Sequence, residues 1–257
     1  MLLTPIRLLG RNVLDILQKF GGMTLLLSQI LSESRSIFRD RMLVIEQMHL
    51  VGVRSLPLVC ITSLFTGAVS SWQAAYQFEG FVSLSYLGGA TSLAIFIELG
   101  PVLTAFVMAG RIGSSIAAEL GTMKVTEQID ALESLAISPI RYLAMPRFWA
   151  AFLMLPLLTV FADVIGVFGA YIVANNLLDI STTMFFDSVQ YFFEVRNIFG
   201  GLAKAFAFGA TVAIVGCFVG LRTYGGAEGV GRSTIEAFVM SAALILINDY
   251  IMATLIF

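Results

Sequence analysis

Charged residues are scarce in this sequence: they make up 12% of its 257 positions, whereas a typical soluble domain carries about 25%. Hydrophobic residues make up 58%. This balance argues against an ordinary soluble domain and predicts a protein whose main solvent is lipid. The 15 Lys and Arg residues face 17 Asp and Glu residues. The chain therefore lacks the excess of positive charge that binding to nucleic acid requires, and no nucleic-acid partner is expected.

Residues that bind metals are almost absent. The chain has one histidine and two cysteines, Cys60 and Cys217, which form no Cys-x-x-Cys motif. Zinc and bis-histidine haem sites are therefore not expected, and we predict no cofactor on this chain. Both cysteines lie in long apolar runs, so we predict that they are buried small side chains. Without a cluster of nucleophile and base residues, an intramembrane enzyme is also disfavoured.

The amino-terminal region, residues 1–48, begins with an amphipathic segment. Residues 2–20 place apolar side chains at helical spacing and charged side chains on the other face. These charges also interrupt any signal-peptide pattern, so we expect Met1 to be retained. Two interpretations remain open: the helix lies in the membrane interface, or it packs on the protein's own cytosolic surface. Residues 32–41, with three arginines, are expected to form a linker at the membrane surface.

Long apolar runs predict the membrane spans. A bilayer core of about 30 Å needs about 20 apolar residues per helix, and five runs fit this requirement if the fourth begins a turn or two before its uncharged part. We therefore predict an all-α integral membrane protein with an amino-terminal interfacial helix and a five-span domain at residues 49–257. The runs are residues 55–78, 80–110, 148–178, 205–221 and 237–257.

Basic residues are distributed unevenly between the two sides of these spans. Thirteen Lys and Arg residues lie in residues 7–54, 111–147 and 222–232, and the other side has only Arg196 and Lys204. Because basic residues accumulate on the cytoplasmic side, we predict a cytoplasmic amino terminus and a carboxyl terminus on the opposite side. An odd number of spans agrees with this prediction.

Four charged residues fall inside the predicted spans: Glu98, Asp163, Lys204 and Asp249. A charge at mid-bilayer costs at least ~2.5 kcal/mol, so such residues are expected to pair or to have a function. We predict that Lys204 and Asp249 pair, because both lie near the outer ends of their helices. The carboxylates also motivate a second hypothesis, a proton-coupled secondary transporter, but no inverted pair of broken spans is evident.

The connection between the second and third spans is the most informative polar stretch of the chain. Polar and apolar residues alternate at spacings of three and four in residues 126–136. This pattern predicts a short amphipathic helix at about residues 124–138, which stops before Pro139. Two interpretations are open: the helix docks an apolar ridge into a groove of a soluble partner, or it only closes a surface connection.

Residues 226–233, GAEGVGRS, superficially match a phosphate-binding loop. Arg232 replaces the required lysine and no β-strand is expected before the segment, so we reject a nucleotide site there. We instead predict a glycine turn, followed by a capping box of Ser233 and Glu236 that starts the fifth span.

The longest recognisable stretch is ELGPVLTAFVMAGRIGSSIAAELGTMKVTEQIDALESLAISPIRYLAMPRFWA, residues 98–150, followed by LPLLT at residues 155–159. With these residues the sequence resembles the MlaE permease family, the membrane subunits of ABC systems that work with MCE-domain proteins on lipid transport. The resemblance runs over nearly the full length of the chain.

This resemblance implies a non-catalytic permease subunit in a bacterial inner membrane, with residues 49–257 as the permease domain. It implies a homodimer, two cytosolic ABC ATPase subunits that hold ATP and magnesium, a periplasmic MCE-domain hexamer and, in many systems, a STAS-domain protein. The substrate would be phospholipid moved between the inner membrane and the MCE partner, which maintains the lipid asymmetry of the outer membrane.

The resemblance also assigns residues to two sites. For the aromatic residues near position 75, the alternative to a lipid pocket is an interfacial aromatic belt. For Glu98, the alternative is a structural carboxylate that caps its own helix, which the nearby Pro101 distorts. The ATPase-coupling helix would use Glu127, Gln128, Asp130, Leu132 and Glu133. The lipid pocket would include Glu98 and Leu99 together with Trp72, Gln73, Tyr76, Gln77 and Phe78.

Overall fold

The computed structural model describes residues 3–256 and, apart from residue 16, the side chains from residue 14 onward. Within residues 3–256 the chain is helical, without a strand. Five helical segments are long and apolar enough to cross a membrane, which confirms the predicted all-α fold with five spans. These segments are Arg41–Phe78, Leu84–Val125, Ile140–Leu177, Val195–Leu221 and Gly226–Ile256.

The first three spans are interrupted by wider, π-helical turns. The first span contains α2 (Arg41–Met48), the turn His49–Val53 and α3 (Leu56–Phe78). The second contains α4 (Leu87–Ala94), the turn Ile95–Leu99, α5 (Gly100–Met108), the turn Ala109–Gly113 and α6 (Ser114–Val125). The third contains the turn Ile140–Ala144 and α8 (Met145–Leu177). The fourth and fifth are α10 (Val195–Leu221) and α11 (Gly226–Ile256).

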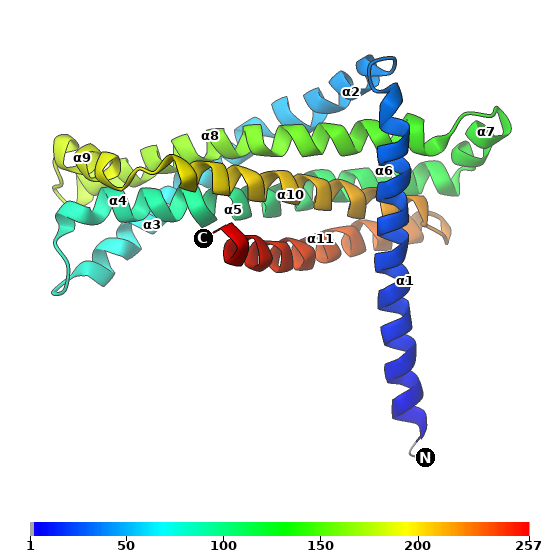
Figure 1. Ribbon diagram of the computed structural model, residues 1–257, viewed down its shortest axis with the longest axis horizontal. Helices are drawn as coiled ribbons and strands as arrows, with labels where there is room; N and C mark the ends of the chain where they lie inside the picture. Colours follow the sequence, from blue (N-terminus) through cyan, green and yellow to red (C-terminus); the bar gives the residue numbers. More distant parts are fainter. Residues whose placement is uncertain (1–2, 257) are drawn as a thin grey trace.

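Helix α1 (Leu3–Glu33) lies across the bundle, roughly perpendicular to the spans (Figure 1). It is longer than the amphipathic segment recognised at residues 2–20. Leu26 and Ile30 are buried against the bundle, whereas Leu17 and Leu25 are exposed. One side of α1 therefore packs on the protein while apolar residues on the other side remain uncovered. The predicted boundary at residues 48 and 49 falls inside the first span, because α2 continues into a π-helical turn.

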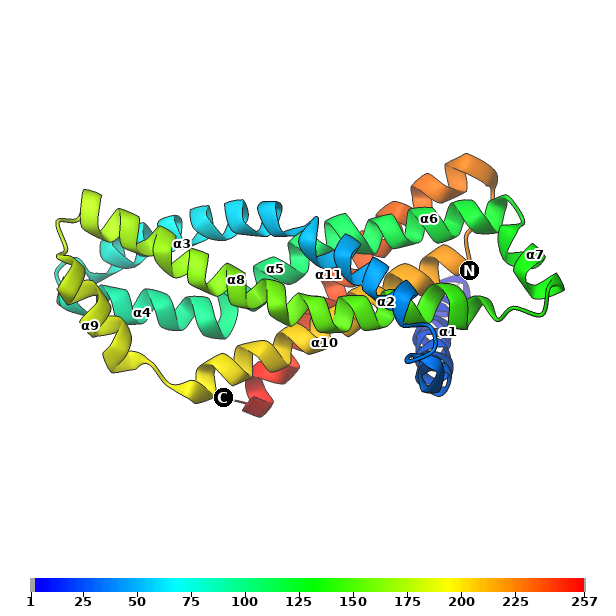
Figure 2. The ribbon, with the colours of Figure 1, turned by 90° about the horizontal axis from the view of Figure 1, so that it is seen from above.

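Helices α3 and α8 lie side by side along the bundle (Figure 2) and contact each other through glycine. A Cβ atom at Gly67 would lie 1.8 Å from the carbonyl oxygen of Gly166, and one at Gly169 would lie 2.1 Å from that of Leu64. Any larger side chain would force the two backbones apart. Small residues thus set the spacing of these helices, as is common where membrane helices pack closely.

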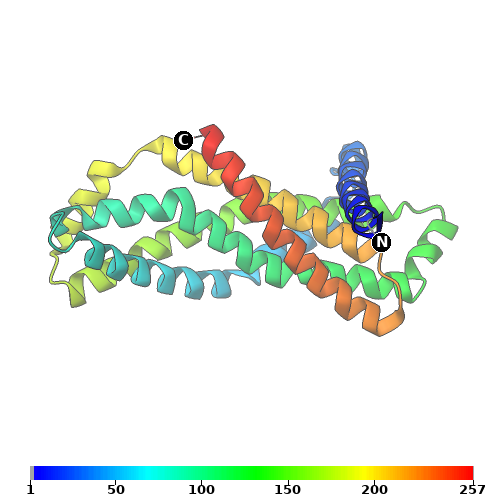
Figure 3. The same cartoon turned by 90° about the horizontal axis from the view of Figure 1, so that it is seen from below.

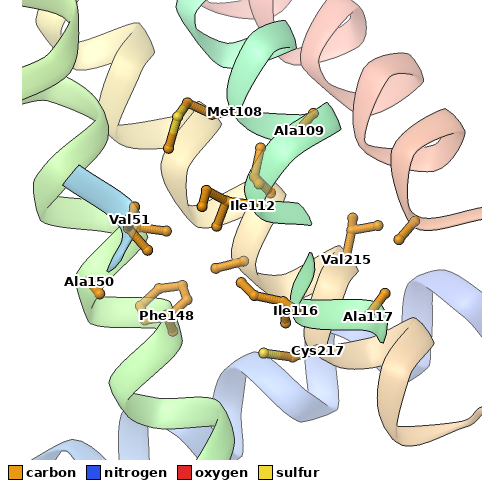
Figure 4. Packing of buried hydrophobic residues seen from close by; sticks show 14 of the residues in the cluster. Val51, Met108, Ala109, Ile112, Ile116, Ala117, Phe148, Ala150, Val215 and Cys217 are labelled. Carbon is orange, nitrogen blue, oxygen red and sulfur yellow. The ribbon is translucent and has the colours of Figure 1, made fainter. Parts of the chain in front are cut away.

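Helix α10 packs on the second span through Gly216 and Gly220. A Cβ atom at Gly216 would lie 2.9 Å from the carbonyl oxygen of Gly113, and one at Gly220 would lie 3.1 Å from Ala117. The Gly-x-x-x-Gly spacing therefore serves packing within one chain and carries no evidence for a dimer. Buried side chains fill the space between these helices, including Cys217 (Figure 4). Cys217 is buried as predicted, and Cys60 is half-buried.

Helix α11 crosses the bundle obliquely (Figure 3) and begins at Gly226, seven residues before Ser233. The predicted capping box is therefore wrong. The positive φ of Gly226 (69°) turns the chain earlier than the capping pattern indicated. Ser233 lies inside the helix, where its hydroxyl accepts a hydrogen bond from Thr223 at 2.9 Å. Glu236 instead pairs with Lys19 of α1.

A further short helix, α9 (Thr182–Phe192), was missed by the sequence analysis. It starts at Ser181, whose hydroxyl accepts a hydrogen bond from the backbone amide of Met184. It packs on α4, where the amide of Gly89 donates to Ser188 Oγ at 2.9 Å. Helix α9 lies at the end of the bundle opposite α7 (Figure 2). The signal for it was the serine cap followed by a mixed polar and apolar segment.

Candidate functional site

A cluster of three charges joins three spans. Lys204 of α10 is fully buried. Its Nζ atom donates to Glu98 Oε2 at 2.5 Å and lies 2.9 Å from Asp249 Oδ1 of α11. The structure thus brings Lys204 and Asp249 together and adds Glu98, which the sequence analysis placed only in the lipid pocket. Such a cluster holds one cation between two carboxylates, so its formal charge is −1.

The two carboxylates of this cluster differ in exposure. The side chain of Glu98 is 44% exposed, and that of Asp249 is 14% exposed. Glu98 accepts a hydrogen bond from Lys204. Asp249 Oδ1 lies close enough to Lys204 Nζ for an ion pair, but their geometry does not meet that of a hydrogen bond. Asp249 therefore belongs to the packed interior, and Glu98 is the member that a ligand outside the bundle can reach.

Glu98 lies in the π-helical turn Ile95–Leu99, where α4 gives way to α5. Pro101 follows in the first turn of α5 and has no backbone N–H to continue the regular hydrogen bonds. The distortion predicted from this proline is confirmed. A π-helical turn changes the direction of the following side chains and is frequent at functional sites. Here it presents Glu98 toward α10.

Asp163 of α8 packs against Gly100, directly after the turn Ile95–Leu99. It is buried, and a Cβ atom at Gly100 would lie 1.8 Å from its Oδ1 atom. Among the residues that the structure describes, this oxygen has no hydrogen-bond partner. Gly100 is therefore required by the close approach of Asp163. The sequence did not indicate this contact, because the two residues are 63 positions apart.

In the described part of the chain, the two cavities that other predicted lipid-pocket residues line do not include Glu98. Trp72 and Tyr76 line a groove of ≈ 290 Å³ near the end of α3, with Leu84 and Leu178 on the other side. Leu99 lines a separate, narrow gap of ≈ 10 Å³. Outside these two spaces, Gln73 and Gln77 are exposed and Phe78 is half-buried.

Helix α3 carries an uncovered apolar stripe. Exposed residues recur along one face at spacings of three and four, and Tyr76 at its end is 78% exposed. A stripe of this kind faces either lipid or another protein surface, because in water it would be unfavourable. The groove beside Trp72 and Tyr76 continues the stripe. Its members are Ile61, Phe65, Val69, Trp72 and Tyr76.

The predicted coupling residues lie on a shorter helix than the sequence indicated. Helix α7 spans Gln128–Ser134, and the predicted range of about 124–138 was too long. The left-handed backbone at Glu127 (φ 60°) and Ala136 (φ 58°) separates α7 from its neighbours. Periodicity alone could not show these reversals. Helix α7 lies at one tip of the molecule, beyond α6 (Figure 2).

The side chains of α7 divide into an anchoring side and a free side. Ile129 is buried in the core. Leu132 is half-buried and packs on that core. Asp130 is paired with Lys124 of α6 at 2.7 Å. The other predicted residues, Glu127, Gln128 and Glu133, are exposed. They form an acidic surface available to another molecule.

An ion pair supports this end of the molecule. Arg141 donates two hydrogen bonds to Asp40, from Nε at 2.7 Å and from Nη2 at 3.1 Å. These bonds lower the pKa of the Asp40 carboxyl below its usual range. Arg141 lies shortly after α7 in the chain. Its two hydrogen bonds to Asp40 therefore connect the segment that follows α7 to the start of the first span. We infer that this connection limits independent movement of this segment.

Five apolar helical spans, a charge cluster shared by three of them and a short helix at one tip define a polytopic α-helical membrane protein. Comparison with known proteins defines it further. The chain belongs to the MlaE permease family: the family model "Permease MlaE" matches residues 44–255. The resemblance stated from the sequence is thereby confirmed.

Several curated relatives match most of the chain. A "Probable ABC transporter permease protein" of Rickettsia felis is 39% identical over 260 residues, covering 100% of this chain and 99% of the relative. One of Synechocystis is 45% identical over 213 residues, covering 83% and 81%. The "Intermembrane phospholipid transport system permease protein MlaE" of Haemophilus influenzae is 31% identical over 261 residues, covering 100% and 99%. The chain is thus similar to ABC transporter permeases over its whole length.

Proposed function

We propose that this chain is the membrane subunit of an ABC transporter that moves phospholipid between the inner membrane and a periplasmic MCE-domain partner. Two copies of the chain form the membrane core. Two cytosolic subunits bind and hydrolyse ATP, and this chain catalyses no reaction. By moving phospholipid, the assembly contributes to the lipid asymmetry of the outer membrane. A STAS-domain protein is a further proposed partner on the cytosolic side.

The observation that carries this proposal is the full-length similarity to a permease named for phospholipid transport. Two features of the site support a lipid substrate. Glu98 is a charged group inside a span and remains 44% exposed. The apolar stripe of α3, from Ile61 to Tyr76, is uncovered in one chain. When two copies meet, a cavity with apolar walls and few polar groups suits a lipid with acyl chains and a head group.

We propose that α7 is the coupling helix for the ATPase. Two exposed acidic residues, Glu127 directly before α7 and Glu133 on it, offer contacts that would fix the position of the helix on the ATPase. Its anchoring residue, Ile129, connects it to the core that holds α6 and α8. Displacement of α7 by closure of the ATPases would thus be transmitted to two spans. Figure 1 places α7 at the same end as α1 and the connection between α10 and α11, where the basic residues accumulate. This supports a cytoplasmic location for that end.

The alternative function, a proton-coupled secondary transporter, has less support. Its motive was three carboxylates inside spans, and two of them, Glu98 and Asp249, contact Lys204. These contacts give both carboxylates a structural role in the charge cluster, and no proton cycle is needed to explain their presence in the spans. Only Asp163 is without such a contact among the described residues.

Purification of the tagged chain from its native membrane tests the proposal. An ABC ATPase and an MCE-domain protein are expected to co-purify. The purified assembly, placed in proteoliposomes that contain a fluorescent phospholipid, is expected to transfer this lipid to or from the MCE protein only when ATP is hydrolysed. Solute movement driven by a proton gradient, without an ATPase bound, would instead establish the alternative.

A further inference from the structure

Two π-helical turns face each other across a groove of ≈ 180 Å³, away from the Lys204 cluster. One wall comes from the turn His49–Val53 and Arg54, and the other from the turn Ala109–Gly113 and the start of α6. Arg54 and Arg111 both line the groove. They stand on different spans, so the fold alone brings these two guanidinium groups to one place.

The groove has an uncompensated positive charge. Within the described residues, neither Arg54 nor Arg111 forms an ion pair with a carboxylate. The acidic residue that lines the groove, Glu119, accepts hydrogen bonds from Arg147 at 3.0 Å and from Ser115 at 3.2 Å. Two arginines therefore present unused donors to a small space. Planar guanidinium groups bind phosphate oxygens in pairs, which makes a phosphate group a well-matched ligand.

Besides the arginines, the groove is lined by the polar residues Gln47, Ser115 and Glu119 and by apolar residues. Val51, Ile112 and Ile116 are buried side chains of its lining, and Figure 4 shows Val51 and Ile112 on the two facing elements. Inorganic phosphate would make no favourable contact with these apolar side chains. An amphiphile fits both the charged and the apolar part of the groove. Its phosphate contacts the arginines while its glycerol and acyl chains lie along the apolar residues.

The position of the groove also favours a lipid. Arg54 directly precedes the uncharged run 55–78, and Arg111 directly follows the run 80–110. Both therefore lie where the apolar core of the bilayer ends, on the side predicted to be cytoplasmic. The lining of the groove extends along α6 as far as Glu119 and includes no residue of α7. The groove is thus a separate surface from that of α7.

We propose that the groove between these two π-helical turns binds the phosphate of an anionic phospholipid from the cytoplasmic leaflet, with Arg54 and Arg111 as donors. Basic pockets between spans on the cytoplasmic side are suited to anionic head groups. This inference needs only a membrane-spanning chain. It does not depend on phospholipid transport or on the exposed Glu98, which lies 13 residues before Arg111.

Native mass spectrometry of the full chain and its co-purified partners tests the proposal. The probe is phosphatidylglycerol added to the detergent solution, with phosphatidylcholine as a zwitterionic comparison. Replacement of Arg54 or Arg111 by glutamine is expected to weaken phosphatidylglycerol binding about fivefold each, from ~1 kcal/mol per basic residue. The double glutamine variant is expected to bind about twenty-five-fold more weakly. A double lysine variant is expected to bind with intermediate strength, because it keeps the charges but loses the planar guanidinium donors.

Arg35→Gln is the matched control, because Arg35 is an exposed cation near the same end but outside the groove. It is expected to bind phosphatidylglycerol like the unchanged chain. Equal lipid binding by the double glutamine variant would overturn the proposal. Displacement of phosphatidylglycerol by millimolar inorganic phosphate would also overturn it in favour of a free-phosphate site. Loss of a protein partner with lipid binding unchanged would assign the groove to a protein contact.

Discussion

Lys204 donates a hydrogen bond to Glu98 at 2.5 Å, and this contact joins α10 to the π-helical turn between α4 and α5. The two residues are 106 positions apart. Asp249 approaches the same amino group from α11. Three spans therefore share one buried cation, and their relative positions depend on the charge balance of a single cluster.

Replacement of Lys204 by methionine is expected to be the most destabilising single change in this cluster. It leaves Glu98 and Asp249 facing each other without the cation between them. Removing one partner of a buried ion pair costs ~3–5 kcal/mol, so the apparent midpoint of thermal unfolding in detergent should fall by on the order of 10 °C. Adding Asp249→Asn to Lys204→Met should recover part of the loss. Strictly additive losses would show that the two residues do not interact.

Replacement of Glu98 by glutamine is expected to impair lipid transport more than folding. It removes one of two carboxylates and leaves Lys204 with Asp249 as a neutral pair. The ATPase should still co-purify, because Glu98 is far along the span from α7. We expect transport to fall at least about tenfold, from the loss of a charged contact worth ~1.5 kcal/mol or more. Transport at the unchanged rate would remove Glu98 from the lipid site.

Replacement of Gly100 by alanine is expected to destabilise the chain, because the new Cβ atom would lie 1.8 Å from Asp163 Oδ1. Overpacking of this kind costs ~1–3 kcal/mol. Gly231→Ala is the matched control, since a Cβ atom there meets nothing within 4 Å. The added change Asp163→Ala should restore stability in thermal unfolding. A Gly100→Ala chain as stable as the control would show that α5 and α8 are not so closely packed.

Charge reversal of Glu127 and Glu133 to lysine is expected to release the ATPase. Both side chains are exposed, Glu127 directly before α7 and Glu133 on it, and Asp130 would remain paired with Lys124. Loss of charged contacts at an interface costs ~2–5 kcal/mol, enough to weaken the complex more than tenfold. Co-purification in detergent measures this, with Glu228→Lys in the first turn of α11 as a control. A double variant that keeps its ATPase and transports lipid normally would make α7 a mere connector.

The amino terminus is expected to be cytoplasmic and the carboxyl terminus periplasmic. The reason is the count of thirteen basic residues on one side of the spans against two on the other. Single cysteines at residues 4 and 254, in a chain without Cys60 and Cys217, can be tested with a thiol reagent that does not cross the membrane. Only the carboxyl-terminal cysteine should react in intact inner-membrane spheroplasts. Reaction at both ends would contradict the five-span arrangement.

Some local features followed from the sequence and others did not. The start of the fourth span before Lys204 and the distortion beside Pro101 followed from helix length and from a missing backbone donor. The ends of α7 did not, because the positive φ values at Glu127 and Ala136 are unusual for these residue types. The capping box at Ser233 fitted the sequence motif, yet glycine started the helix earlier.

The sequence by itself determined the class of protein and the number of spans, because the length of an apolar run is a local property fixed by bilayer thickness. It also indicated that each charge inside a span needed a partner. Only the tertiary structure decided which partners meet. Helix packing through Gly67, Gly166 and Gly216 sets how the spans approach one another, and that approach places Lys204 between two carboxylates rather than one. It likewise places Arg54 beside Arg111. Such contacts depend on backbone spacing across distant segments, and no local pattern records that spacing.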